Sequence, residues 1–405
     1  MAEARGVVVV GGGLAGGKTV EALRENGYDG PVTLVAAEPH LPYERPPLSK
    51  GFLAGDDERD SVFVHDEPWY ADHDVALRLG EAVTAVDSGA HEVQTSSGER
   101  LPYDRLVLAT GSQPRRLDLP DLDDTHRERV LYLRTLDDSE RLKGWLREGV
   151  RLAVVGGGWI GLEVAAAARN AGVEVTVVEM DSLPLQRVLG PTIAAGFAQL
   201  HRDHGVDLRT GVSVEGVTAA GEGLQVALSD GSTVDADVVL VGIGIVPDTA
   251  LAEAAGLDVD NGVVTDAQLR TSDPDVFAVG DVANAEYPAV GRRLRVEHWA
   301  SALNQPAVAA RAILGHDDTY DLLPYFFTDQ YDLGMEYHGI ADPQRDRLVV
   351  RGSLDGAYVA AWVGDDGRVV AAMHVNSWDD SDAVKGLVGK PLDEQRFTDT
   401  DVPLG

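Results

Sequence analysis

Short apolar runs that end in glycine recur along this chain. The first is Val7–Val10, which is β-branched throughout and is followed by glycines at 11, 13 and 16 and by the helix-like segment 18–24. This pattern predicts a strand, a tight turn and a helix. Gly11 permits the turn, Gly13 lets a diphosphate approach the backbone, and Gly16 lets helix and strand pack closely. The helix N-terminus then offers N–H groups to the phosphates.

The same unit continues to an acidic residue. Residues 32–37 are predicted to form its second strand, and Glu38 follows, 22 residues beyond the third glycine. That distance is close to the roughly 20 residues at which a carboxylate meets an adenosine ribose in such units. A proline-stiffened loop over 41–50 then carries Arg45 and Lys50, which we expect to contact the cofactor.

The whole glycine unit occurs a second time, at 156–161, again between an apolar strand and a helix-like segment. Its second strand, 173–178, ends at Glu179, 18 residues beyond the last glycine. An acid at this place favours NAD, because the 2′-phosphate of NADP would meet a carboxylate instead of an arginine. Arg187 lies eight residues further on and is not expected to rescue NADP binding.

The first turn also fits the P-loop spacing of a nucleotide triphosphatase, since Gly12 is followed after four residues by Gly17-Lys18-Thr19. That interpretation lacks a convincing acid for magnesium after a later strand, and it leaves the second glycine unit unexplained. Two dinucleotide sites in one chain indicate instead a flavoenzyme with FAD on one site and NADH on the other.

Later apolar runs return to the first domain. Arg105–Leu108 is predicted to be a buried strand that reaches the turn Ala109-Thr110-Gly111, and the run at 238–248 leads the chain back to this domain. Val276–Val279 ends in Gly280 and Asp281. Because an acid at the carboxyl end of a strand faces the crevice where ligands bind, we expect Asp281 to bind the ribitol of a flavin, with a helix N-cap as the alternative.

From about residue 320 the composition changes. Strands are predicted over 348–352, 357–363 and 369–375, and a short helix over 379–392. A small α+β terminal domain is therefore expected. The predicted domains are a first FAD-binding part over 1–112, an NAD-binding domain over 113–244, a second FAD-binding part over 245–318 and the terminal domain over 319–405.

Composition excludes several classes of function. The 405 residues are 44% hydrophobic and 25% charged, as in an ordinary globular protein of two or three domains. A formal net charge of −33 disfavours nucleic acid as a partner. Without any cysteine, the chain has no redox disulfide, cysteine nucleophile or thiolate-held cluster of its own. No apolar run approaches the roughly 20 residues of a membrane span, and residues 1–5 lead directly into a core strand, so we expect a cytoplasmic protein without a signal peptide.

The motifs together resemble those of FAD-dependent ferredoxin reductases of the putidaredoxin reductase type, over essentially the whole chain. The motifs that carry the resemblance, in family order, are Gly11–Gly16, Arg45–Lys50, Ala109–Gly111, Gly156–Glu163, Gly242–Pro247, Gly280-Asp281 and Asp329–Asp332. The resemblance implies an α/β fold with two Rossmann-like dinucleotide-binding domains, for FAD and NAD, and a small α+β C-terminal domain, in a glutathione-reductase-like architecture. One departure is Phe327, where the family often has tryptophan.

The resemblance also implies roles for individual residues. Lys50 and Glu163 would form a pair beside the isoalloxazine and the nicotinamide and serve as the catalytic residues of a hydride transfer that needs no metal and no protein nucleophile. The implied FAD contacts are Gly11, Gly13, Leu14, Ala15, Gly16, Glu38, Arg45, Lys50, Val83, Ala109, Thr110, Gly111, Arg134, Gly280, Asp281 and Trp299. The implied NAD contacts are Gly156, Gly158, Ile160, Gly161, Glu163, Glu179 and Gly244.

The implied electron acceptor is a 2Fe-2S ferredoxin that supplies a monooxygenase or a dioxygenase. Such carriers are usually acidic, as this chain is, but screening acts over roughly 8 Å at physiological salt, so a local patch can dominate docking. Arg292, Arg293 and Arg295 form the densest basic cluster and are predicted to dock the ferredoxin, with exposed turn residues as the alternative. The alternative function is an NADH oxidase-type flavoenzyme without cysteine that reduces oxygen or a quinone-like acceptor.

Overall fold

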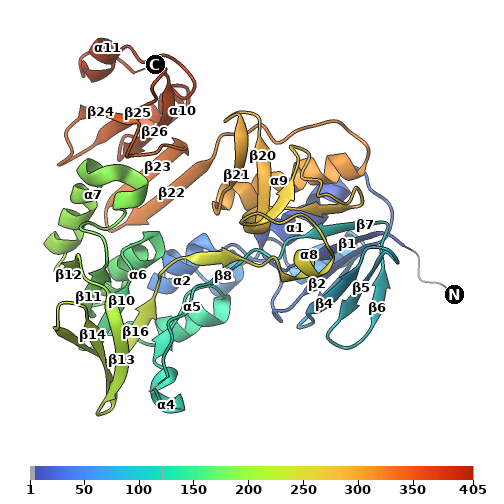
Figure 1. The fold of residues 1–405 in the computed structure, drawn as a ribbon, viewed down its shortest axis with the longest axis horizontal. Coiled ribbons are helices and arrows are strands. Elements are labelled where there is room, and N and C mark those ends of the chain that lie inside the picture. Colours follow the sequence, from blue (N-terminus) through green and yellow to red (C-terminus); the bar gives the residue numbers. More distant parts are fainter. Residues whose placement is uncertain (1–4, 121, 405) are drawn as a thin grey trace. The chain divides into compact units, whose positions relative to one another are not determined.

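The chain forms two compact units, seen here in a computed structural model that describes residues 5–120 and 122–404. Unit 1 comprises the described residues up to Arg45 together with 58–113 and 245–324. Unit 2 comprises 46–57, 114–244 and the described residues from Tyr325 onward. The chain changes unit at five places, and two of these fall at the short paired strands β8 (Ser112–Pro114) and β17 (Ile245–Pro247). Figure 1 labels many of the elements of both units.

Unit 1 is built on a five-stranded parallel sheet in the order β19-β7-β1-β2-β3. The strands are β1 (Val7–Val10), β2 (Val32–Ala36), β3 (Val75–Leu79), β7 (Arg105–Leu108) and β19 (Val276–Ala278). Strand β1 pairs with β2 on one side and with β7 on the other, so the chain changes direction across the sheet at β1. Ligands bind in the crevice at the carboxyl ends of strands at such a switch point.

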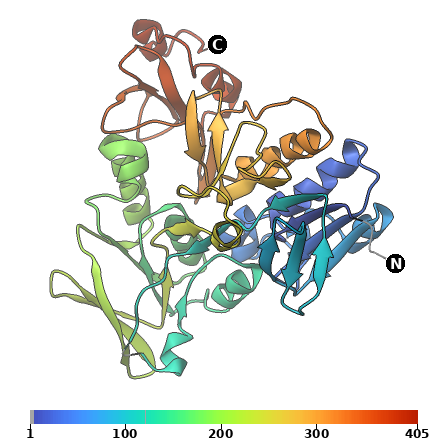
Figure 2. The ribbon, with the colours of Figure 1, turned by 45° about the vertical axis from the view of Figure 1, so that its right-hand side comes forward.

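Both faces of this sheet are covered, because its strands are apolar on both sides. Helix α1 (Leu14–Glu25) follows β1 and packs on α9 (Trp299–Ile313). The antiparallel sheet β4-β5-β6 lies against the other face (Figure 2). Its Val86 and Val93 share a core with Val8 and Val10 of β1. The remaining elements of unit 1 are β4 (Val83–Asp87), β5 (Glu92–Thr95), β6 (Arg100–Pro102), α3 (Glu67–Asp72), α8 (Ala250–Ala254), β18 (Val263–Thr265), β20 (Ala283–Tyr287) and β21 (Arg292–Arg295), with short 3-10 helices η2 (Arg59–Val62) and η3 (Gly280–Val282).

Unit 2 repeats this plan. Its parallel sheet has the order β12-β11-β10-β16-β9. Strand β10 pairs with β11, the next strand in sequence, on one side and with the later strand β16 on the other, as β1 does with β2 and β7. The antiparallel sheet β13-β14-β15 covers one face through a core that contains Val155, Val178 and Val226. The elements are β9 (Val130–Leu131), β10 (Arg151–Val155), β11 (Glu174–Glu179), β12 (Asp207–Thr210), β13 (Val214–Ala220), β14 (Gly223–Leu228), β15 (Thr233–Ala236), β16 (Val238–Val241), α4 (Asp124–Arg127), α5 (Leu136–Lys143), α6 (Trp159–Asn170) and α7 (Gln186–Asp203), preceded in sequence by η1 (Pro46–Ser49) and α2 (Gly51–Ala54).

The C-terminal part of unit 2 is an antiparallel sheet in the order β22-β23-β26-β25-β24. The strands are β22 (Tyr325–Gln330), β23 (Leu333–Gly339), β24 (Arg347–Gly352), β25 (Tyr358–Val363) and β26 (Val369–Val375), followed by η4 (Trp378–Asp380), α10 (Ser381–Lys385) and α11 (Glu394–Thr398). The helix predicted over 379–392 is wrong in extent, because α10 ends before Gly386 and Gly389 takes a left-handed φ of 84° that a helix cannot hold.

The described residues thus contain two Rossmann-like sheets of similar plan and a small α+β domain, and the predicted fold class is confirmed. Among these residues no helix is both long and apolar enough to cross a membrane.

Candidate functional site

The first glycine turn has a backbone that only glycine fits. Gly11 has φ of 126°, and a Cβ there would lie 2.1 Å from the carbonyl oxygen of Ala109 on the neighbouring strand. A Cβ on Gly16 would lie 1.9 Å from the oxygen of Gly11, so the helix packs directly on the turn. The N-cap of α1 is Gly13, no side chain caps the helix, and its first turn contains no acid. The first N–H groups are therefore available to an anion.

A cation and an acid flank this turn. The Arg45 guanidinium lies over Gly13, with Nη1 2.7 Å from the place of a Cβ. The Glu38 carboxylate accepts a hydrogen bond from the Tyr43 hydroxyl at 2.7 Å and lies 3.8 Å from Arg45. Glu38 is 32% exposed, so its oxygens can accept further hydrogen bonds from ribose hydroxyls.

The other residues predicted in unit 1 border the same turn or its neighbours. The backbone of Gly280 approaches Ala15, since a Cβ on Gly280 would lie 2.9 Å from the Ala15 Cβ, and Asp281 follows directly. The Trp299 indole, at the start of α9, donates to the Glu44 carboxylate at 2.8 Å, next to Arg45 in sequence. Val83 is the first residue of β4. Three residues before it, the Gly80 amide donates to the Glu38 carbonyl at 3.0 Å. Thr110 and Gly111 follow β7, where the Thr110 hydroxyl donates to the Asp248 carbonyl at 2.7 Å.

This donor set fits a flavin dinucleotide. An uncapped helix N-terminus and an arginine suit a diphosphate, while the carboxylate of Glu38 suits a ribose. The P-loop interpretation does not fit: Lys18 pairs with Glu21 within α1, and the Thr19 hydroxyl, which would have to reach magnesium, is buried and donates to the Ala15 carbonyl at 2.6 Å.

The second glycine turn has the same backbone and different surroundings. A Cβ on Gly156, where φ is 106°, would lie 2.3 Å from the oxygen of Gly242, and one on Gly161 would lie 2.2 Å from the oxygen of Gly156. Helix α6 also begins without a side-chain cap or an acid in its first turn. Around Gly158, however, no atom lies within 4 Å of the Cβ position. The turn is therefore open.

Glu179 supports this turn from within. It is only 8% exposed, and its two carboxylate oxygens accept the Gly157 and Asp181 amides, each at 2.7 Å. Beside it lies a cavity of about 470 Å³ lined by residues 155–159, 178–181, 185–188, 212–214, 242–244 and Leu117. Met180 and Val188 on this lining are 62% and 45% exposed, an apolar surface that suits a flat base. Gly244 lines the cavity too, while Ile160 lies in α6 directly after Trp159.

A buried ion pair in unit 2 joins the two residues predicted to be catalytic. The Lys50 ammonium lies 2.7 Å from Glu163, which is 4% exposed. Glu163 also accepts the hydroxyls of Ser49 at 2.5 Å and Thr328 at 2.7 Å. The Lys50 ammonium further lies 5.4 Å from the centre of the Phe327 ring. Glu163 thus has three donors, which is what a buried carboxylate needs.

Hydrogen bonds continue from this pair into helix α7. Gln330 donates to the Thr328 hydroxyl at 3.2 Å, and its carbonyl oxygen lies 2.9 Å from His201 Nε2. Burial lowers the pKa of His201 from 6.5 to about 4, so the imidazole is neutral at neutral pH and can donate through Nε2. Sequence reasoning assigned no role to Ser49, Thr328, Gln330 or His201, although Ser49 and Gln330 lie in the motifs Arg45–Lys50 and Asp329–Asp332. The Asp329–Asp332 motif pointed to the region, but the contact between β22 and α6 is visible only in the fold.

Two predicted flavin contacts, Lys50 and Arg134, belong to unit 2. Arg134 directly precedes the N-cap of α5, and its backbone amide donates to the Asp138 carboxylate at 3.2 Å. The other predicted FAD contacts are in unit 1, and all predicted NAD contacts are in unit 2.

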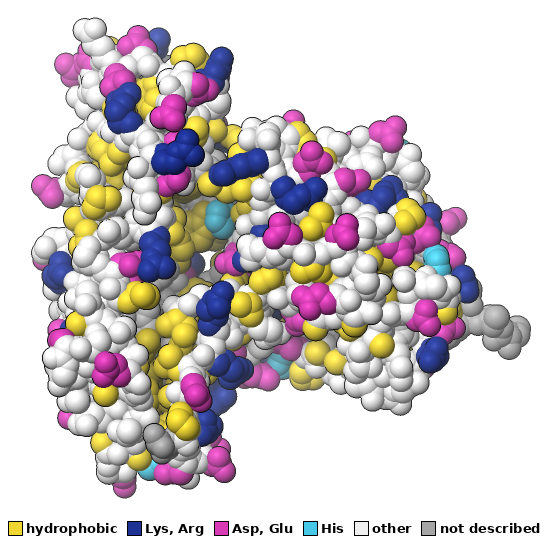
Figure 3. Space-filling view, in the orientation of Figure 1, with side chains coloured by type: hydrophobic (Ala, Val, Ile, Leu, Met, Phe, Trp, Pro, Cys, Tyr) yellow, Lys and Arg dark blue, Asp and Glu magenta, His cyan; other side chains and the backbone are white. Residues whose placement is uncertain are grey.

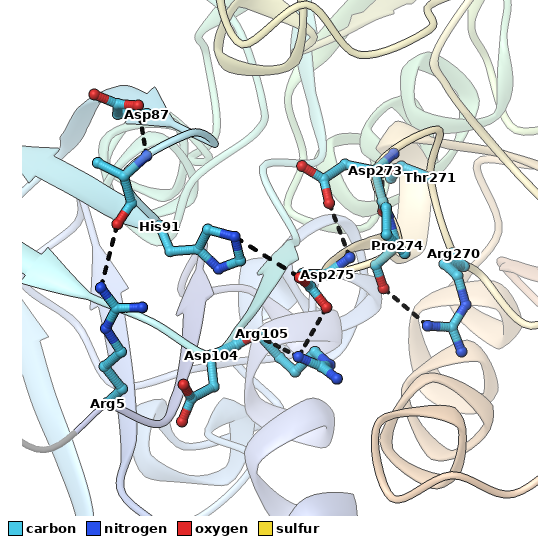
Figure 4. Close-up of polar contacts among 11 residues, drawn as sticks. Arg5, Asp87, His91, Asp104, Arg105, Arg270, Thr271, Asp273, Pro274 and Asp275 are labelled. Atoms are coloured by element: carbon cyan, nitrogen blue, oxygen red, sulfur yellow. Dashed lines mark hydrogen bonds and ion pairs between the residues drawn. The ribbon is translucent and has the colours of Figure 1, made fainter.

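A second polar cluster lies at the opposite edge of the unit 1 sheet (Figure 4). Asp275 precedes β19 and lies 2.8 Å from Arg105 at the start of β7 and 3.8 Å from His91. Burial, with help from Asp273 and Asp275, raises the pKa of Tyr103 to about 12. This cluster lies at the amino ends of the strands, away from the carboxyl ends at which parallel sheets bind ligands.

The basic cluster predicted to dock a ferredoxin forms strand β21 rather than a turn. Arg293 donates to the Asn284 carbonyl at 2.8 Å and to the Thr265 carbonyl, and Arg295 pairs with Glu297. Arg292 is exposed. On the face drawn in Figure 3, acidic and basic side chains are interspersed over the surface.

Comparisons with known proteins agree with this geometry. The model of the pyridine nucleotide-disulphide oxidoreductase family matches residues 5–306, and that of the reductase C-terminal domain matches residues 325–405. The chain is 42% identical over 402 residues to the ferredoxin–NAD(+) reductase component of the anthranilate 1,2-dioxygenase system of Burkholderia cepacia, covering 98% of both chains. It is 38% identical to putidaredoxin reductase of Pseudomonas putida, covering 98% of this chain and 95% of that one.

A solved structure, that of the covalent putidaredoxin reductase–putidaredoxin complex, superposes with a TM-score of 0.93 at 37% identity, covering 100% of this chain and 98% of that one. The family model spans well over half of the chain, and these relatives match it almost from end to end. The chain therefore belongs to the pyridine nucleotide-disulphide oxidoreductase family, within the group of ferredoxin–NAD(+) reductases that includes putidaredoxin reductase.

Proposed function

We propose that this chain is an FAD-dependent NADH:ferredoxin reductase of the cytoplasm, which passes electrons from NADH to a 2Fe-2S ferredoxin serving a monooxygenase or a dioxygenase. The observation that carries the proposal is the pair of glycine turns, each with an uncapped helix N-terminus and an acid at the end of the next strand. Of the relatives named above, one is the ferredoxin–NAD(+) reductase component of a dioxygenase system and the other is a putidaredoxin reductase.

In this proposal FAD binds unit 1. The α1 N-terminus and Arg45 hold the diphosphate, Glu38 holds the adenosine ribose, and Asp281 holds the ribitol. Residues 1–112 and 245–318 then form the FAD domain, 113–244 the NAD domain and 319–405 the terminal domain. The parallel sheet β19-β7-β1-β2-β3 supports the first assignment, because it draws strands from both FAD segments.

NADH binds the open turn of unit 2 in the same way. The α6 N-terminus binds the diphosphate, Glu179 meets the ribose, and the apolar lining around Met180 and Val188 takes the adenine. No cysteine is present, so the disulphide chemistry in the family's name is not open to this chain.

When bound, the flavin supplies the chemistry, accepting a hydride and releasing single electrons. The protein supplies orientation and charge. The Glu163 carboxylate holds the Lys50 ammonium in place, while Ser49 and Thr328 hold the carboxylate. We place this pair beside the flavin ring, where a fixed positive charge favours the reduced form. The Phe327 ring lies 5.4 Å from the ammonium, within the range of a cation–π contact.

A test of the function compares electron acceptors. The purified protein should be yellow, should be bleached by NADH without oxygen, and should reduce cytochrome c much faster when a 2Fe-2S ferredoxin is added. Equal NADH consumption with and without ferredoxin would instead support the oxidase alternative. ATPase activity without flavin absorption would overturn the proposal altogether.

The role of the ion pair is tested by stopped flow. Lys50→Ala and Glu163→Ala should each slow flavin reduction by NADH, because the charge beside the ring is lost or misplaced. Lys390→Ala, which removes an exposed lysine, is the matched control. Unchanged rates of flavin reduction in both pair variants would refute the role.

Docking of ferredoxin at β21 is tested by charge reversal. Because Arg293 and Arg295 are engaged by their own strand's neighbours, Arg292→Glu should weaken ferredoxin-dependent cytochrome c reduction while leaving the fold intact. NADH-driven flavin reduction is the internal control. Unaltered cytochrome c reduction would exclude this surface.

A further inference from the structure

The mouth of the cavity in unit 2 contains an ion pair that the proposed NADH site does not need. Arg187 Nε donates to Asp181 Oδ2 at 2.6 Å, and its Nη2 donates to Oδ1 at 2.9 Å. Both residues line the cavity, together with Glu179. Among the described residues that line it, Arg187 is the one with a permanent positive charge.

Asp181 occupies one of the bidentate edges of the Arg187 guanidinium. Of its five N–H donors, the parallel pair on Nε and Nη2, which suits a carboxylate or a phosphate, is bound to Asp181. The hydrogen bond to Asp181 accordingly raises the pKa of Arg187. The side chains of Glu179, Asp181 and Arg187 carry a formal charge of −1 in total, which opposes a dianionic ligand.

The Glu179 carboxylate is held in place by its own turn. Its two oxygens already accept the Gly157 and Asp181 amides within the buried turn. The arginine would therefore stay exposed at the rim if Asp181 lost its charge, since it is 68% exposed now.

We propose that Asp181 determines the choice between NADH and NADPH by holding Arg187 away from the 2′-position of the bound nucleotide. This inference rests on the proposed function of the cavity. Asp181 acts through Arg187, whereas Glu179 holds the turn and meets the ribose as in the proposed function. Neutralising Asp181 releases an arginine that can bind a 2′-phosphate.

The test uses Asp181→Asn, which keeps the size of the side chain and the backbone amide that binds Glu179. Binding of NADH, NADPH and adenosine 2′,5′-bisphosphate to the flavin-loaded protein is measured by calorimetry, and kcat/KM is measured for both nucleotides. We expect the NADPH-to-NADH ratio of kcat/KM to rise about tenfold and the bisphosphate to bind about tenfold more tightly. Adding Arg187→Ala to Asp181→Asn should abolish both gains.

Asp207→Asn is the matched control, because Asp207 forms a similar exposed pair with Arg209 in β12 of the same unit but outside the cavity lining. Failure of the bisphosphate to bind Asp181→Asn more tightly overturns the inference, provided that wild type binds NADH. An equal gain in Asp207→Asn also overturns it, since the effect would then be one of net charge. If wild type binds neither nucleotide, the proposed function falls and this inference with it.

Discussion

The two glycine turns share one backbone and differ in what surrounds it. Arg45 lies over Gly13 at the first turn, whereas the space around Gly158 at the second is open. The acid of the first turn, Glu38, is partly exposed, and that of the second, Glu179, is buried in its own loop. A turn closed by a cation suits a cofactor that stays bound, and an open turn suits a nucleotide that enters and leaves.

The helices that follow the turns differ at the same position. Five residues beyond the N-cap, α1 has Lys18 and α6 has Glu163. Lys18 pairs within its own helix with Glu21, which also binds His65 at 2.6 Å. Glu163 instead reaches Lys50 and β22, distant in sequence. The duplicated sequence pattern therefore gives two similar backbones. The side chain five residues beyond the N-cap decides whether the helix forms only local contacts, as α1 does through Lys18, or holds the ion pair predicted to be catalytic, as α6 does through Glu163.

The largest effect should come from the turns themselves. Gly11→Ala would force a Cβ onto the Ala109 carbonyl and should cost more than about 3 kcal/mol, with loss of bound flavin. In Gly156→Ala the new Cβ would clash with the Gly242 carbonyl and should destabilise the protein to a similar extent. The molecules of this variant that do fold should still bind the flavin. Flavin absorbance per folded chain measures the difference. Gly196→Ala, which meets no atom within 4 Å, is the control and should be tolerated. Equal flavin loss in both turn variants would remove the distinction between the turns.

The two helix positions should differ next most. Glu163→Leu leaves the Lys50 ammonium and two hydroxyls without their acceptor, and should lower the free energy of unfolding by about 3 kcal/mol. Lys18→Met should cost no more than about 1 kcal/mol, because Glu21 keeps His65. Urea unfolding followed by circular dichroism measures both. Similar losses in the two variants would contradict the comparison.

Acid should weaken unit 2 through His201. The ordinary pKa of 6.5 applies in the unfolded chain, and burial lowers it to about 4 in the folded one. As the pH falls from 6.5 towards 4, only the unfolded chain binds this proton, so stability is lost there. Between pH 7 and 5 this amounts to about 2 kcal/mol. His201→Gln should show a correspondingly shallower loss over that range, and an identical slope would refute the assignment.

The smallest effect separates the two acids. Glu179→Gln replaces an oxygen that accepts a backbone amide of the turn and should cost about 1–2 kcal/mol of stability even without nucleotide. The Glu38 carboxylate accepts a hydrogen bond from the Tyr43 side chain, whereas Glu179 accepts backbone amides of its turn. Glu38→Gln should therefore leave the stability of the flavin-free protein almost unchanged and weaken flavin binding. Thermal unfolding with and without added cofactor distinguishes the two outcomes.

Sequence patterns alone were enough to predict the two Rossmann-like units, because β-branched runs, glycine spacing and the acid after the second strand are local features. They also predicted the pairing of Lys50 with Glu163 through resemblance, and the distance of 2.7 Å agrees. The terminal helix was misjudged over 379–392, where Gly386 and Gly389 outweigh the helix-like composition.

Tertiary structure decided what the side chains do. Arg293 and Arg295 form their polar contacts within their own region, Glu179 holds its turn, and Asp181 binds Arg187. These contacts form where strands and loops come close in the fold, and residue spacing in the sequence does not encode them. The physical reason is that backbone turns depend on residues a few positions apart, whereas the partners of a charged side chain depend on which strands the sheet order brings together. The sequence by itself determined two nucleotide turns, and packing decided that one is closed by a cation and the other left open.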